Sequence, residues 1–224
     1  MTFVVRLWLP DRPGALGQVA SRIGAVRGDV VGIDILERGG GQAVDELVVE
    51  LPDADLLDML VREIRQVDGV RVEEVRPLAD GRHHDPRLDA LEAMAQLVAA
   101  ADEVDLLDGL VSHLCRVVGA SWAAVVDLEP HGQEVVARLG DAPSGGWLRA
   151  FINGTADGGA QPSDTAWSPL PSAGLALVVG REDMDFRTRE RREIAAFARV
   201  ADTRRRELTR EASRSRHPSL SPRN

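Results

Sequence analysis

The stretch Leu9-Pro10-Asp11-Arg12-Pro13-Gly14-Ala15-Leu16 separates a strand-like segment from a helical one. Proline lacks a backbone N–H and disfavours helix at the residue before it, so Pro10 and Pro13 end the strand that begins at Thr2. Pro13 suits the first position of a helix, and Gly14 removes a side chain where the helix opens. Unpaired N–H groups at a helix N-terminus attract anions, so this turn is a candidate site for a carboxylate. It supplies no nucleophile or base.

Apolar residues on either side of this turn alternate as in strands or recur as in amphipathic helices. They predict strands over residues 2–9, 30–36, 44–51 and 70–75. One helix follows the turn and ends near Gly28 as a cap, and a second begins at residues 52–54. The order is βαββαβ, the ferredoxin-like arrangement, in which two helices cover one face of an antiparallel sheet.

Three motifs in residues 3–78 resemble those of ACT domains, the small regulatory modules of amino-acid metabolism. They are Asp11 to Leu16 after the first strand, Gly28 to Val31 at the second, and Asp68-Gly69-Val70 before the fourth. The resemblance implies that two domains pair side by side and bind an amino acid between them. It assigns binding roles to a first set of residues, which is Asp11, Arg12, Pro13, Gly14, Ala15 and Leu16. Facing them from the second domain would be Asp29, Val30 and Val31.

Position 29 departs from the ACT pattern, because many ligand-binding members have Asn where this chain has Asp29. An amide both donates and accepts hydrogen bonds, whereas a carboxylate only accepts them. Asp29 would therefore favour the ammonium group of a ligand and repel its carboxylate.

The second half of the chain predicts a smaller α+β domain. Residues 1–79 form the first domain, 80–86 a polar linker, 87–209 the second domain and 210–224 a disordered tail. Apolar stripes predict two helices, the first marked by Leu88, Leu91, Ala95 and Val98. A hairpin over residues 122–139, a Gly-rich middle at 140–164, a strand at 175–179 and a helix from about Arg189 to Leu208 follow.

This pattern over residues 86–208 resembles a GAF domain, with its best local match at Leu175 to Arg181 followed by Phe186 and Thr188. The resemblance implies that the first and last helices form a dimer bundle. The short Gly-rich middle segment argues against a ligand pocket of its own. No Cys/His pair suits haem or a linear tetrapyrrole, so no cofactor is expected.

Composition narrows the function classes. The chain has 224 residues, 44% of them hydrophobic, and a formal net charge of −9 that argues against general nucleic-acid binding. The single cysteine, Cys115, cannot form an internal disulfide, which fits a reducing compartment. The N-terminus lacks the pattern of a signal peptide, and no apolar run approaches membrane-spanning length. We expect a cytoplasmic protein without membrane contact.

No residues form a recognised catalytic or metal site in the sequence. His83, His84 and Asp85 are adjacent in the linker and fit a solvated segment better than metal ligands. Arginines of the last helix alternate with acids, as on an ordinary solvated helix face. We expect no enzyme, but a regulatory or sensor protein that binds a small amino acid at a homodimer interface. The alternative is a ligand-free dimerisation or protein-interaction module.

Overall fold

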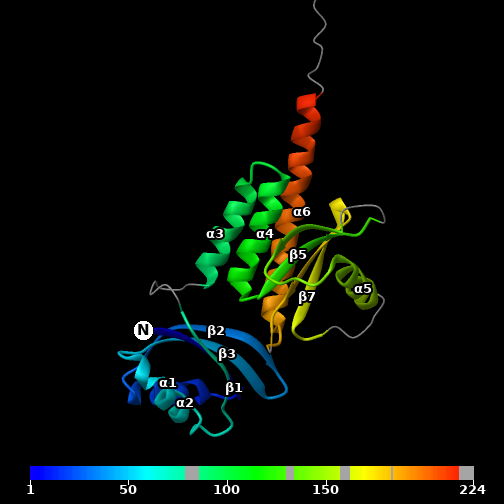
Figure 1. Cartoon of the computed structure of the whole chain (residues 1–224). Helices are drawn as coiled ribbons and strands as arrows, with labels where there is room; N and C mark the ends of the chain where they lie inside the picture. The colour runs from blue at the N-terminus through cyan, green and yellow to red at the C-terminus, as the bar shows by residue number, and fades with distance from the viewer. Residues whose placement is uncertain (79–85, 130–133, 157–161, 183, 217–224) are drawn as a thin grey trace, which may run out of the picture. The chain divides into compact units, whose positions relative to one another are not determined.

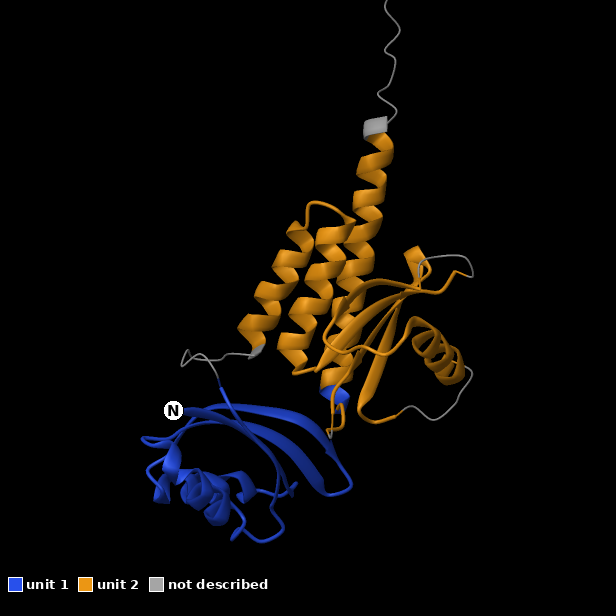
Figure 2. Cartoon of the chain, viewed as in Figure 1, with its two compact units in different colours: residues 1–85, 187–189 blue, residues 86–186, 190–224 orange. Residues whose placement is uncertain are grey.

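The computed structural model describes residues 1–78, 86–129, 134–156, 162–182 and 184–216. The chain divides into two compact units (Figure 2), the first comprising Met1–Asp85 with Arg187–Arg189 and the second Pro86–Phe186 with Glu190–Asn224. None of the helices in the described ranges combines the length and apolar character needed to cross a bilayer.

The first unit has the ferredoxin-like order. Its elements are β1 (Thr2–Pro10), α1 (Ala15–Ala25), β2 (Asp29–Gly39), β3 (Gln42–Glu50), a 3₁₀ turn (Ala54–Leu56), α2 (Leu57–Ile64) and β4 (Arg71–Pro77). The sheet order is β2-β3-β1-β4 and every pair is antiparallel. Helices α1 and α2 lie on one face of this sheet (Figure 1). The fold expected for this part of the chain is confirmed.

The core of the first unit follows the alternation of β1. Phe3, Val5, Leu7 and Leu9 are all buried and pack against Val19 and Ile23 of α1 and Leu60 and Ile64 of α2. The four residues of β1 that point to the helices are all apolar, so this strand lies at the centre of the core.

Both ends of α1 differ from the expectation. The helix begins at Ala15 rather than Pro13, because Gly14 takes φ 85° and cannot be helical. At the other end the left-handed residue is Arg27, at φ 61°, and not Gly28. A Cβ at Gly28 would lie 2.9 Å from Cγ2 of Ile23, so Gly28 is required by close packing.

The second unit is a four-stranded antiparallel sheet between helices. Its elements are α3 (Pro86–Ala99), α4 (Glu103–Val118), β5 (Trp122–Asp127), β6 (Val135–Leu139), α5 (Gly145–Ala156), β7 (Thr165–Leu170), a 3₁₀ turn (Pro171–Ala173), β8 (Leu175–Gly180) and α6 (Thr188–Arg216). The strand order is β6-β5-β8-β7. Helices α3, α4 and α6 lie on one side and α5 on the other (Figure 1). The α+β class expected here, with its long last helix, is confirmed.

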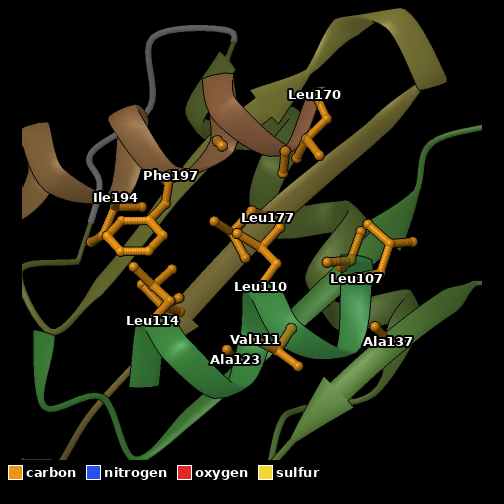
Figure 3. Close-up of a cluster of buried hydrophobic side chains, with 14 of the residues drawn as sticks. Leu107, Leu110, Val111, Leu114, Ala123, Ala137, Leu170, Leu177, Ile194 and Phe197 are labelled. Atoms are coloured by element: carbon orange, nitrogen blue, oxygen red, sulfur yellow. The ribbon is translucent and has the colours of Figure 1, made fainter. Parts of the chain in front are cut away.

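The main core of the second unit lies between α4, α6 and the sheet. Leu110 and Leu114 of α4 meet Leu177 of β8 and Phe197 of α6 (Figure 3). A smaller cluster on the opposite face joins Leu148 and Ile152 of α5 to Ala124, Val126, Ala176 and Val178 of the sheet.

Three features of this unit differ from the sequence expectation. Helix α5 lies in the Gly-rich middle, where no helix was predicted, because Leu148 and Ile152 are four residues apart and both pack on the sheet. Helix α6 continues to Arg216, into residues expected to belong to the tail. In α3 the side chains that pack in the core are Ala93 and Leu97, followed by Ala100 just after the helix, and the predicted stripe faces solvent.

Candidate ligand site

The turn between β1 and α1 is held against the tip of the β2–β3 hairpin. Asp11 donates its backbone N–H to the carbonyl of Gly41 at 3.0 Å. Its carboxylate Oδ1 lies 3.9 Å from Nε of Arg38 on the same hairpin. Residues 11–14 are exposed, whereas Ala15 is buried in the core and Leu16 is half-buried against it. The turn is therefore fixed in position and open to solvent. Because the side chain of Ala15 is buried, only its backbone could contact a ligand at the turn.

Helix α1 begins without a side-chain cap. Gly14 occupies the N-cap position and the first turn contains no acidic residue. In the described part of the chain, the N–H groups of Leu16 and Gly17 have no hydrogen-bond acceptor, and the first bond of the helix runs from Gln18 to the carbonyl of Gly14 at 3.0 Å. Free donors at the positive end of an 11-residue helix form an anion-binding arrangement.

Within one chain, the second group of predicted site residues lies at the opposite end of the sheet from this turn. Asp29 pairs with Glu50, and Glu50 pairs with Thr2 at the start of β1. The turn follows the other end of β1, where Pro10 pairs with Gln42. One chain therefore does not bring Asp29, Val30 and Val31 to the turn, and a complete site needs a second copy.

Strand β2 forms an edge of the sheet, because β3 is its only neighbour in the described sheet (Figure 1). This edge strand also carries isoleucine side chains that remain exposed on the helix side of the sheet. Ile33 lies opposite Leu47, which is fully buried beneath the helices, yet Ile33 is 48% exposed and Ile35 is 39% exposed. A long edge strand with exposed isoleucines is a ready surface for strand pairing.

Asp45 is a buried acid that sequence reasoning did not single out. It lies on β3 between Leu7 of β1 and Ile35 of β2, on the face covered by the helices, and is 3% exposed. Its Oδ1 has no hydrogen-bond partner within the described residues. Burial is the main cause that raises the pKa of the Asp45 carboxyl above its ordinary value. The positive charge of Arg38 lowers this pKa in part, and the negative charge of Asp11 raises it further.

A sequence signal for Asp45 exists. Residues 43, 45, 47 and 49 share one face of β3, and three of them are Ala, Leu and Val. An acid in that series breaks the apolar alternation, which favours a functional or strained position.

The second unit contains a groove on its α5 side with a volume of about 460 Å³. Its lining residues are Trp122, Trp147, Pro162, Asp164, Thr165, Arg181 and Glu182. Arg181, the cation in this lining, is held by Glu190 and by the carbonyl of Val118, which stabilises the unit itself. The groove was not expected from the Gly-rich middle segment.

The cysteine and the arginines that the sequence offered as other candidates lie in contacts that maintain the fold of the second unit. Burial raises the pKa of the Cys115 thiol to about 11, so this thiol is a poor nucleophile. Arg204 donates to the carbonyl of Ala100 at 2.9 Å, and Arg205 pairs with Glu103 at 2.8 Å. In the described ranges no group of three acids, histidines or cysteines could hold a metal. His83, His84 and Asp85 lie outside those ranges.

No protein-family model matches the chain, and no curated protein is similar to it in sequence. Solved structures that resemble it include the ACT domain from GTP pyrophosphokinase of Chlorobium tepidum, which is 22% identical over 35% of this chain and 97% of that domain, with a TM-score of 0.29.

A bacteriophytochrome from the photosynthetic bacterium R. palustris is 14% identical over 81% of this chain and 43% of its own length, with a TM-score of 0.41. A formyltetrahydrofolate deformylase from Pseudomonas putida is 17% identical over 35% of this chain and 29% of its own length, with a TM-score of 0.28. This chain therefore spans less than half the length of either protein.

Proposed function

We propose that this chain is a non-catalytic regulatory protein whose first unit binds a small amino acid between two copies of the chain. The observation that carries the proposal is the uncapped start of α1, where the N–H groups of Leu16 and Gly17 have no acceptor in the described chain. These donors suit the carboxylate of a ligand. Asp29 of a second copy and the nearby Asp11 suit its ammonium group.

Antiparallel pairing of two β2 edges about a two-fold axis completes such a site. In that arrangement the beginning of β2 in one copy lies beside the end of β2 in the other. The end of β2, at Gly39, adjoins the hairpin tip that holds Asp11. Pairing also covers Ile33 and Ile35, and a ligand bound across the axis stabilises the dimer by mass action.

Isothermal titration of the full chain with each common amino acid tests this function. Gly17→Pro removes one of the free N–H groups at a position in the first helical turn, where proline is tolerated. Gly17→Ala is the matched control, since it keeps the N–H and its Cβ meets no atom within 4 Å. We expect one amino acid to bind the wild type and the Ala variant, and to bind the Pro variant about tenfold or more weakly.

Asp11→Ala is a second variant for the same titration, and we expect it to weaken the binding of the same amino acid. If no amino acid binds the wild type at millimolar concentration, the ligand assignment is wrong. If Gly17→Pro binds as tightly as Gly17→Ala, the ligand does not use the start of α1.

The second candidate function is a ligand-free dimerisation or interaction module. The ion pair between Asp11 and Arg38 favours it, because this pair already occupies the carboxylate of the turn. The carboxylate of Asp29 also repels an incoming carboxylate. A chain that dimerises through β2 but shows no heat of binding with any amino acid would have this second function.

A further inference from the structure

The side chain of Asp45 is buried without a partner for one of its oxygens. It is 3% exposed, and its Oδ1 accepts no hydrogen bond from the residues that the structure describes. A carboxylate that gives up its hydration without gaining a hydrogen bond destabilises the folded chain. A residue that costs stability where its neighbours on β3 are apolar is typical of a functional position.

Asp45 lies near the candidate site at the start of α1. It is three residues along β3 from Gln42, which pairs with Pro10 immediately before the turn. At a rise of about 3.4 Å per residue, Asp45 is roughly 10 Å along the strand from the turn. Its side chain is on the same face of the sheet as that of Leu7, with which it pairs, and this is the face that α1 covers (Figure 1). The Asp45 carboxyl and the free N–H groups of α1 are therefore on the same side of the sheet.

The arginines around the turn do not supply a partner for Oδ1 of Asp45. The charge of Arg38 lowers the pKa of Asp45 in part, but its Nε lies 3.9 Å from Asp11, and its side chain is 59% exposed. Arg12 donates instead to the neutral Oε1 of Gln18, at 3.5 Å. A cation that pairs with Asp45 would therefore have to come from a bound molecule. On the β2 side the neighbour of Asp45 is Ile35, which is itself 39% exposed, so the carboxyl lies close to an open edge of the sheet.

We propose that the ligand of this site is a basic amino acid whose side-chain cation pairs with Asp45, an inference that rests on the function proposed above. The backbone of α1 and the acids Asp11 and Asp29 already suit the two charges that every amino acid carries, and they leave Asp45 unmatched by a neutral one. Lysine and arginine place a cation at the end of a long apolar stem, which fits the separation between the turn and Asp45. Either cation donates charge-assisted hydrogen bonds to a carboxylate.

Isothermal titration of the full chain with lysine, arginine and norleucine tests the charge preference. Norleucine has the four-carbon stem of lysine and lacks only the terminal ammonium group. We expect lysine or arginine to bind the wild type about tenfold or more tightly than norleucine, because a hydrogen bond to a buried charge is stronger than one between neutral groups. This comparison of ligands needs no variant of the protein.

Asp45→Asn tests whether Asp45 is the residue that recognises the cation. The amide has nearly the shape of the carboxyl but carries no charge, so the variant should bind lysine, arginine and norleucine within about twofold of one another. Asp58→Asn, at an exposed position on α2, removes the same charge elsewhere and should keep the wild-type preference. Urea unfolding of both variants checks that each is folded.

The possible outcomes separate this inference from the proposed function. Equal affinities of the wild type for lysine, arginine and norleucine, or tighter binding of norleucine, would overturn the basic ligand and leave amino-acid binding intact. A preference for lysine or arginine that persists in Asp45→Asn would show that another group recognises the cation, and would overturn the role of Asp45. If no amino acid binds the wild type, the proposed function and this inference are both wrong.

Discussion

Asp45 has a charge that its surroundings do not favour. Its side chain is buried on the face of the sheet that the helices cover, and burial raises the pKa of its carboxyl above the ordinary value of 3.8. The folded state therefore binds the Asp45 proton more tightly than the unfolded state. Stability from this group is complete below pH 3.8 and is lost as the pH rises through the folded pKa.

We expect Asp45→Asn to unfold at higher urea concentration than the wild type at pH 7, with a gain of about 1–2 kcal/mol. The gain should shrink as the pH falls towards the ordinary carboxyl pKa, because Asp45 then becomes neutral in the wild type too. Asp68→Asn, at an exposed position, is the control and should change stability little. A loss of stability at pH 7 in the Asn variant would show that the charge of Asp45 is needed for folding.

The junction of α4, β8 and α6 depends on one buried arginine. Arg181, directly after β8, makes two 2.8 Å hydrogen bonds to the carboxylate of Glu190 in α6. It also donates to the carbonyl of Val118 at the end of α4 at 2.9 Å, and its guanidinium lies 4.1 Å from the ring centre of Phe186. Arg181 is 4% exposed and Glu190 is 4% exposed.

We expect Arg181→Met to destabilise the protein by about 3–5 kcal/mol in urea or thermal unfolding, because it leaves the Glu190 charge buried beside unpaired carbonyls. Arg206→Met is the control, since its ion pair with Asp202 is 3.8 Å long and its side chain is 50% exposed. That change should stay within about 0.5 kcal/mol. Equal effects of the two substitutions would mean that the buried pair adds no more than a surface one.

The proposed β2 surface leads to a prediction about the mass of the assembly. Isologous pairing of one surface about a two-fold axis gives a closed dimer, whereas heterologous contacts can generate an open chain of copies. We expect a closed dimer, with the mass of two chains at all concentrations above the dissociation constant in sedimentation equilibrium.

Ile33→Glu on β2 should raise the dimer dissociation constant about tenfold or more. Met59→Glu, at an exposed position on α2, is the control and should leave the mass unchanged. A wild-type mass that keeps rising with concentration would contradict a closed dimer, and an unchanged dissociation constant for Ile33→Glu would show that β2 is not in the interface.

Much of the first unit could be predicted because its signals are local. The alternation in β1, the prolines and glycine of the turn and the stops at Gly28 and Asp68-Gly69 each act within a few residues. For the candidate site, local signals indicated the turn from Asp11 to Gly14, and these residues are exposed. Asp45 reaches the vicinity of this turn through strand pairing, which no local pattern specifies.

Periodicity and turn chemistry depend on neighbouring residues, so the order of strands and helices in the first unit could be predicted from the sequence alone. Which apolar surfaces meet depends on the tertiary fold. Helix α5 forms in a Gly-rich segment because Leu148 and Ile152 pack against one face of the sheet. In α3 both sides are apolar, so spacing alone could not tell which of them the core would bury. Burial results from contacts between distant segments, and for α3 those contacts left Leu88, Leu91 and Val98 in solvent.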